Sequence, residues 1–392
     1  MGRISRVVSL AMAAALAAPS VAAASPAAEG EGTSAQLTIG GGLDGAAPLA
    51  VIDGRLDRAW VGRRGELAIG VGARLRWRDG EVVTDDWDEP RDAAALLRYL
   101  EVARRQGAVD LALAAGALAD VAVAHLVRGY TAAVEADVVR AGAHAAAAWD
   151  GGRVEAVVDD VVRPVVVGGA VEVALGRRLA AIGATAIDLG GVDPGVRPMM
   201  VPTAHATFEL GARWRDGAWP SLGAAAVAAT EGGAALVVDV AAHGTVRGVR
   251  AEGYLEGRAH VGDGAAVPVG PLARVTRERL PAMDTGDAGV GAAIGGALVS
   301  PALGEISGEL RRAVTGWRGH ARLLAGAREP VQVGAWAAID DRDVAVAAEL
   351  RARWSPHTIS RLEATRTYGR DELGELAPRW QVVAWFGTVV GW

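Results

Sequence analysis

The last stretch of the chain, Arg379 to Trp392, reads R-W-Q-V-V-A-W-F-G-T-V-V-G-W. Successive side chains of a β-strand point to opposite faces, so residues two apart share a face. Counting back in twos from the final residue gives a row that is apolar except for one threonine: Trp392, Val390, Thr388, Phe386, Ala384, Val382 and Trp380. The stretch therefore predicts an amphipathic strand that ends on an aromatic residue.

The same alternation recurs upstream. Between Gly65 and Arg78, one face is apolar from Leu67 to Trp77 and the other carries Arg74 and Arg76. Comparable runs separated by turn residues continue from residue 108 to the end, including one at 119–127, and predict about 14 to 18 strands. The predicted fold class is all-β, with a single barrel domain over 61–392.

One segment has a different period. Asp88 and Pro90 precede a run to Gln106 that Gly107 closes, and these residues suit a helix start and stop. Ala93, Leu96, Leu97, Leu100 and Ala103 would share one helical face. The sequence predicts one short amphipathic helix at 90–106, in an early loop.

The first 24 residues have the pattern of a secretory signal. Arg3 and Arg6 precede an apolar run, and Ala22 to Ala24 form a small-residue cleavage site. Residues 1–24 are therefore expected to direct export. Residues 25–60, rich in Gly, Ala and Asp, are interpreted as an N-terminal linker with one weak strand at 36–43.

Composition excludes several function classes. The chain has no Cys, which excludes disulfides and thiolate metal sites. Its formal net charge is −6, and nucleic-acid binding needs a basic footprint, so nucleic acid is excluded as a partner. The seven His residues show no metal-ligand spacing, and no Ser lies in a G-x-S-x-G motif. We expect no metal, no cofactor and no enzymatic activity.

The terminal strand resembles the C-terminal signal of bacterial outer-membrane β-barrel proteins, the porin-like class. Phe386, Gly387, Val390 and Trp392 fit that pattern, whereas Trp385 occupies the position where the pattern has a polar residue. The resemblance implies a single antiparallel transmembrane β-barrel in the outer membrane of a Gram-negative cell. It also implies outer-membrane lipid and the barrel assembly machinery as partners.

Loop lengths and tryptophans agree with a membrane barrel. With the C-terminus in the periplasm, the longer connections 79–107, 128–139, 189–203, 262–288 and 367–378 all fall on the extracellular side, as is usual for such barrels. Tryptophans at strand ends predict two interface girdles. Trp149, Trp214 and Trp354 form the periplasmic girdle, and Trp77, Trp317 and Trp380 form the other.

The polar faces of the strands predict the residues that line the lumen. The candidates are Arg74, Arg76, Arg213, Arg250, Glu252, Glu256, Glu309, Arg311, Arg318, His320, Arg322, Glu349, Arg351 and Arg353. Charges of both signs would set ion preference in a water-filled lumen, or pair into a plug that closes it.

These observations favour a channel that passes small solutes or ions passively. The alternative is a closed or plugged barrel with a structural or ligand-binding role, presenting loops 189–203 and 262–288. Less favoured are a soluble periplasmic all-β protein and an outer-membrane enzyme that uses His320 with Glu309 or His125 with Asp120. The helix at 90–106 is a candidate gate.

Overall fold

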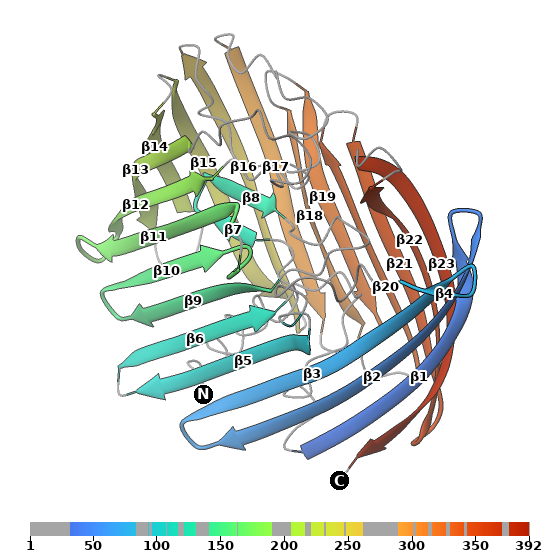
Figure 1. Cartoon of the computed structure of the whole chain (residues 1–392). Helices are drawn as coiled ribbons and strands as arrows, with labels where there is room; N and C mark the ends of the chain where they lie inside the picture. Colours follow the sequence, from blue (N-terminus) through green and yellow to red (C-terminus); the bar gives the residue numbers. More distant parts are fainter. Residues whose placement is uncertain are drawn as a thin grey trace.

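The computed structural model describes residues 32–391 apart from 84–92, 94–95, 107, 117–120, 131–140, 163, 190–204, 216–220, 231–232, 247, 262–288, 301–302, 313–315, 327–329, 341–342 and 371–375. Its strands form one closed antiparallel ring of 20 (Figure 1). The ring consists of β1 (Gly32–Asp44), β2 (Ala47–Gly62), β3 (Gly65–Arg78), β5 (Leu97–Gln106), β6 (Val109–Gly116), β9 (Gly142–Trp149), β10 (Gly152–Val158), β11 (Val166–Ala174), β12 (Leu179–Asp188), β13 (His205–Arg215), β14 (Ser221–Ala229), β15 (Ala234–Val246), β16 (Val249–Val261), β17 (Gly289–Ser300), β18 (Gly304–Arg312), β19 (Trp317–Ala325), β20 (Val331–Asp340), β21 (Asp343–Ser355), β22 (Thr358–Arg370) and β23 (Leu376–Gly391). The barrel prediction is confirmed, with more strands than expected.

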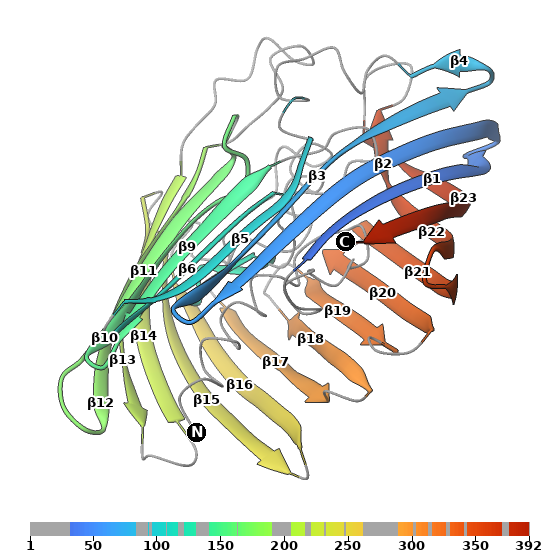
Figure 2. The ribbon, with the colours of Figure 1, turned by 90° about the horizontal axis from the view of Figure 1, so that it is seen from below.

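The terminal strand closes the ring. β23 pairs with β22 on one side and with β1 on the other, where Ile39 lies opposite Phe386. Figure 2 shows β23 beside β1 near the C-terminus. Closure leaves no strand edge unpaired, which is the condition for a sheet to lie in lipid.

The linker prediction for residues 25–60 is wrong over its described part. Residues 32–62 form β1 and β2, which are full members of the barrel. Position 40 of β1 is occupied by glycine because a Cβ there would come 2.8 Å from the ring of Trp385 on the neighbouring strand. Small residues that make room for a partner's side chain thus gave this segment the composition of a linker. The predicted signal at 1–24 lies outside the described residues.

The predicted helix at 90–106 is also wrong where it is described. Leu97–Gln106 is strand β5, which pairs with β3 and β6, and the described part of the chain contains no α-helix. Without β5, the edges of β3 and β6 would carry unpaired backbone groups, and that cost outweighs a helical side-chain period. No helix of the described residues is long and apolar enough to cross a membrane.

A second, small sheet lies inside the ring. β7 (Val121–Val123) and β8 (Val127–Tyr130) form a hairpin between β6 and β9 in sequence. Figure 1 shows this hairpin within the barrel, and β7 contacts β10, β11 and β12. The prediction of a barrel strand at 119–127 is therefore wrong, because the segment pairs with itself instead of joining the ring.

The two faces of the ring differ in chemistry. Along β23, Val382 and Phe386 are exposed, by 42% and 62%, whereas Val383 and Trp385 are buried at 2% and 3%. Leu37 and Ile39 on β1 and Leu350 on β21 continue the exposed apolar band. In water such a band would cost about 25 cal/mol per Å², so a lipid environment is the one that suits it.

Connection lengths differ between the two ends of the barrel. At the end that holds the C-terminus, the turns are short: 63–64, 107–108, 150–151, 175–178, 216–220, 247–248, 301–303, 326–330 and 356–357. At the other end, four connections are longer: 79–96, 117–141, 189–204 and 262–288. Of the connections predicted to share the extracellular side, 189–203, 262–288 and 367–378 join strands at this second end, although the last has only residues 371–375 between its strands. The prediction of 79–107 as one connection is wrong because β5 occupies 97–106, and the prediction of 128–139 is wrong at its start because β8 extends to Tyr130.

Candidate functional site

The candidate site is the inner face of the barrel and the hairpin that contacts it. We use "hairpin wall" for the inner face of β10 to β16, where the hairpin packs. We use "opposite wall" for the inner face of β21, β22, β23, β1, β2, β3 and β5, which lies across the ring in the strand order. The two walls hold different kinds of polar groups.

Apolar packing seats the hairpin on its wall. Leu126 and Val127 of the hairpin are 2% and 0% exposed, and they form one cluster with inward side chains of five strands. The wall members of that cluster include Val157, Ala186, Ala225, Val227 and Val237. Short side chains on β12 and β14 leave a recess that the hairpin fills.

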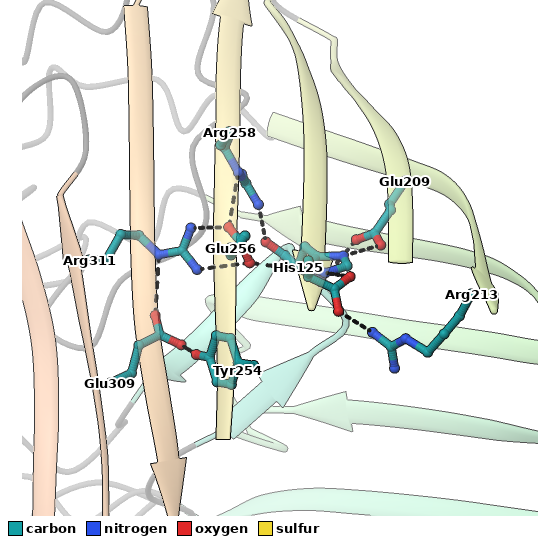
Figure 3. Close-up of polar contacts among 9 residues, drawn as sticks. His125, Glu209, Arg213, Tyr254, Glu256, Arg258, Glu309 and Arg311 are labelled. Atoms are coloured by element: carbon teal, nitrogen blue, oxygen red, sulfur yellow. Dashed lines mark hydrogen bonds and ion pairs between the residues drawn. The ribbon is translucent and has the colours of Figure 1, made fainter. Parts of the chain in front are cut away.

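His125 lies at the turn of the hairpin, among carboxylates of the wall (Figure 3). Its Nδ1 is 2.6 Å from Oε1 of Glu209, and its Nε2 is 3.2 Å from Oδ1 of Asp239. The His125 backbone N–H donates to Oε2 of Glu209 at 2.9 Å. Arg258 donates to the His125 backbone carbonyl, also at 2.9 Å. Both the imidazole ring and the backbone of His125 thus join the hairpin to the wall.

The strand alternation explains why these wall groups converge. Tyr254, Glu256 and Arg258 are two residues apart on β16, so they share one face. Asp239 lies directly opposite Glu256 in the β15–β16 register. Two like charges in that position would destabilise the pair unless cations neutralise them. Arg213, Arg258 and Arg311 supply those cations.

Small residues let side chains reach across intervening strands. Glu256 and Arg311 both pair with Ala293 of β17, and Arg311 binds both carboxylate oxygens of Glu256, at 2.5 and 3.3 Å. Arg311 also donates to Glu309 at 3.2 Å, and Glu309 accepts the Tyr254 hydroxyl. A Cβ at Gly295 would lie 2.6 Å from the Tyr254 ring, so a glycine at this position is needed for Tyr254 to reach across β17 to Glu309.

The opposite wall carries arginines and aromatic rings. Asp53 accepts from Arg74 at 3.3 Å and from Arg98 at 3.1 Å. The Trp385 ring lies beneath two guanidinium groups, with Arg74 at 5.2 Å and Arg361 at 4.4 Å from its centroid. Such cation–π contacts hold the two guanidinium groups over the ring.

Solvent exposure separates the two walls. On the hairpin wall, His125, Asp239, Glu256 and Arg258 are each 3% exposed. On the opposite wall, the side chains of Arg74, Arg98 and Asp53 are 28%, 22% and 16% exposed. The hairpin therefore covers the charges that it contacts. The opposite wall holds these partly exposed charges together with buried ones, namely Arg76, Asp57 and Glu349 at 6–7% exposure.

The lumen candidates all lie on the strand face opposite to the exposed apolar side chains, according to the strand registers. Arg213, Glu256, Glu309 and Arg311 belong to the network around the hairpin. Arg74, Glu349 and Arg351 lie on the opposite wall, where Glu349 faces Glu363 and Arg351 faces Arg361. Whether the candidates line an open lumen stays a prediction.

The remaining candidates are distributed around the ring. Arg318 pairs with Asp340 at 2.9 Å, and His320 lies opposite Glu309 in register. Arg322 lies opposite Ser307, and Arg76 is buried at 6% exposure. Arg250 and Glu252 face Thr245 and His243 near the 247–248 turn. Arg353 donates to the Pro356 carbonyl in the 356–357 turn.

The other predicted positions are on the outer face or at its ends. Trp149, Trp214, Trp317, Trp354 and Trp380 are 41–72% exposed, and Trp77 is half-buried. They lie at the strand ends expected for two girdles, and Trp60 on β2 adds a further exposed indole. Phe386 and Val390 are exposed on β23, and Gly387 allows close approach of Leu37. Trp392 lies outside the described residues.

The sequence prediction missed the main partners of His125. Glu209 and Asp239 were not among the predicted residues, although each occupies a polar position in an alternating strand. The predicted partner Asp120 lies outside the described residues. Among the residues that the structure describes, no cluster of His and acidic groups has an arrangement that would hold a metal ion.

Comparisons with known proteins find neither a matching family model nor a matching curated protein. Among solved structures, OccK2 (OpdF) of Pseudomonas aeruginosa matches with a TM-score of 0.38 and 8% identity, over 92% of this chain and 97% of that one. OpdK of the same organism with vanillate gives 0.35 and 10%, over 93% and 99%. OccAB3 of Acinetobacter baumannii gives 0.33 and 7%, over 92% and 99%.

Proposed function

We propose that the chain is a porin-like channel that lets small solutes or ions pass passively across an outer membrane. The observation that carries the proposal is the contrast between the two faces of a closed ring: lipid suits the outer face, and water suits the charged inner face. Barrels of 16 to 18 strands already leave an aqueous channel, and this ring has 20. The hairpin covers one wall, so the solute path follows the opposite wall.

The orientation and assembly of the channel belong to the same proposal. Short turns of outer-membrane barrels face the periplasm and longer loops face outward. The end with connections 117–141 and 262–288 is therefore the outer end. Residues 1–24 direct export, and the barrel assembly machinery reads the last strand. Deleting Trp392 should lower the amount of folded protein in the membrane; normal insertion without it would contradict this role of the terminus.

The second candidate function is a plugged barrel with a structural or binding role. The observation that favours it is the hairpin itself, whose His125 and Leu126 are almost fully buried against the wall. In this alternative, the connections at the outer end would carry the function. The proposal includes no catalytic reaction.

Swelling of proteoliposomes separates the two functions. The mature chain is refolded in detergent, and insertion is verified by its heat-modifiable mobility on a gel. We expect swelling with small uncharged sugars and progressively slower swelling with larger ones. Vesicles that receive the heat-unfolded chain provide the control. Verified insertion without swelling, even in the smallest sugar, would favour the plugged barrel.

A further inference from the structure

The contacts of His125 impose a requirement on its protonation. A neutral imidazole has one N–H donor and one acceptor nitrogen. Here Nδ1 faces Glu209 at 2.6 Å and Nε2 faces Asp239 at 3.2 Å, with Glu256 at 4.0 Å. In a neutral ring, one lone pair would point at a carboxylate. The imidazolium, with two donors, is the form that fits both neighbours.

We propose that His125 is a proton-dependent latch. While its imidazole is charged, it holds the β7–β8 hairpin against the hairpin wall and narrows the channel. This inference rests on the proposed channel for its effect on transport. When the imidazole loses its proton, two hydrogen bonds between ions become one hydrogen bond from an uncharged N–H to a carboxylate and one repulsive contact between a lone pair and the other carboxylate. The hairpin is then held by Leu126 and Val127 and by the backbone contacts.

The carboxylates that face His125 also have partners of their own. Arg213 contacts Asp239 at 3.4 Å, and Arg311 and Arg258 contact Glu256. Loss of the histidine proton therefore leaves these arginine contacts of the wall in place and removes the positive charge that His125 itself contributes. Other titratable groups lie on the inner faces of the strands of the hairpin wall and on the loop between β10 and β11. They include Arg153, Glu155, Asp159, Asp160, Glu172, His243, Arg250, Glu252, Tyr254 and His260. His125 is distinguished from them because it alone belongs to the hairpin.

The direction of the pH effect follows from these contacts. At lower pH the imidazole of His125 is charged and donates to both carboxylates, so the latch is complete. As the pH rises, the imidazole loses its proton and the latch weakens. Strong acid would neutralise the carboxylates as well, so the test stays between pH 6 and pH 9.5.

The absence of cysteine from the chain makes a thiol-protection test direct. Val227 is 2% exposed and belongs to the cluster that Leu126 covers, so Val227→Cys reports whether the hairpin is seated. Leu303, 73% exposed in a turn, provides Leu303→Cys as the reference for intrinsic thiol reactivity at each pH. Labelling with a small methanethiosulfonate is measured on protein folded in detergent.

We expect the labelling rate of Val227→Cys, relative to Leu303→Cys, to rise about tenfold or more between pH 6 and pH 9.5, since a charge-assisted hydrogen bond is lost. Adding His125→Asn should give the high rate at both pH values. Adding His125→Arg, which keeps a cation, should give the low rate at both. Folding of each variant is checked by heat-modifiable mobility.

Two results would overturn the proposal. One is equal protection of Val227→Cys with and without His125→Asn. The other is a pH response that persists in the His125→Arg background, because the proton would then act elsewhere. The labelling needs no ion current, so it separates the latch from the channel. Labelling as expected without current in any variant would reject the channel and retain the latch.

Discussion

The two walls of the barrel keep charged side chains in two different ways. On the hairpin wall, a second layer of protein covers them, and each of Asp239, Glu256 and Arg258 is 3% exposed. On the opposite wall, Trp385 and Tyr99 support arginines that stay partly open, as the 28% exposure of Arg74 shows. Buried charges need full pairing, whereas half-exposed charges remain available to ions. The hairpin wall thus buries its central charges under a second layer of protein, and the opposite wall keeps its arginines around Trp385 partly exposed.

The largest effect is expected from a change that attacks the barrel common to both walls. Val382→Arg places a charge on the outer face, where Val382 is 42% exposed beside apolar neighbours. It should cost about 2–4 kcal/mol of unfolding free energy if the position is near the membrane midplane. Equilibrium unfolding by urea in lipid vesicles measures this. Arg351→Gln, on an inner face, is the control and should be mild; equal costs would mean that the faces are assigned wrongly.

The next prediction compares apolar contacts on the two walls. Leu126→Ala should weaken hairpin seating by about 2–5 kcal/mol, as buried leucine truncations do, and leave the unfolding of the barrel unchanged. Val51→Ala, at a residue buried in the cluster with Trp385, should instead lower the stability of the barrel by about 2 kcal/mol. Protection of Val227→Cys and urea unfolding give the two readouts. A loss of barrel stability in Leu126→Ala would mean that the hairpin is part of the core fold.

A third prediction tests passage along the opposite wall. Replacing both Arg74 and Arg361 by Gln removes two cations that flank Trp385. The cation-to-anion permeability ratio should rise roughly two-fold or more, because wall charges set ion preference. Reversal potentials in a salt gradient measure the ratio. Arg353→Gln, near the end of β21 and beside the 356–357 turn, is the matched control. An unchanged ratio would place the ion path elsewhere.

The smallest effect concerns the edge of the network around the hairpin. Tyr254→Phe removes the hydrogen bond to Glu309, which keeps Arg311 as a partner. The expected loss is about 0.5–1.5 kcal/mol of unfolding free energy, the net value of one hydrogen bond. Urea unfolding checks it. A loss well above that range would show that Tyr254 supports Glu309, Arg311 and Glu256 as a unit.

The sequence predicts most of the ring because most strands keep an apolar outer row and a polar inner row. In β3, for example, Leu75 points outward and Arg74 and Arg76 inward, as alternation requires. β2 has the same signal, with Ile52, Leu56 and Trp60 alternating with Asp53 and Asp57. This signal is masked in the sequence by the Gly-rich segment of β1 that precedes it. Within that segment, Gly40 leaves room for the ring of Trp385.

Two features could not be read from local patterns. Over Leu97–Gln106, Leu97 and Leu100 are spaced as on a helical face, and β5 accommodates them through a register shift against Gly70 and Val71 of β3. The unpaired edges that β3 and β6 would otherwise have decide for the strand. The hairpin at 121–130 alternates like a barrel strand, yet it pairs with itself. Its contact from His125 to Glu209 joins residues 84 apart in the chain, and no local spacing encodes it.

The most direct test of a water-filled path beside the latched hairpin is single-channel current. The mature chain, with insertion verified by heat-modifiable mobility, is placed in a planar bilayer at neutral pH. We predict steady current steps for the unmodified chain and larger steps for His125→Asn. Verified insertion with no current from either protein would contradict the account, because the barrel would then be closed even without its latch.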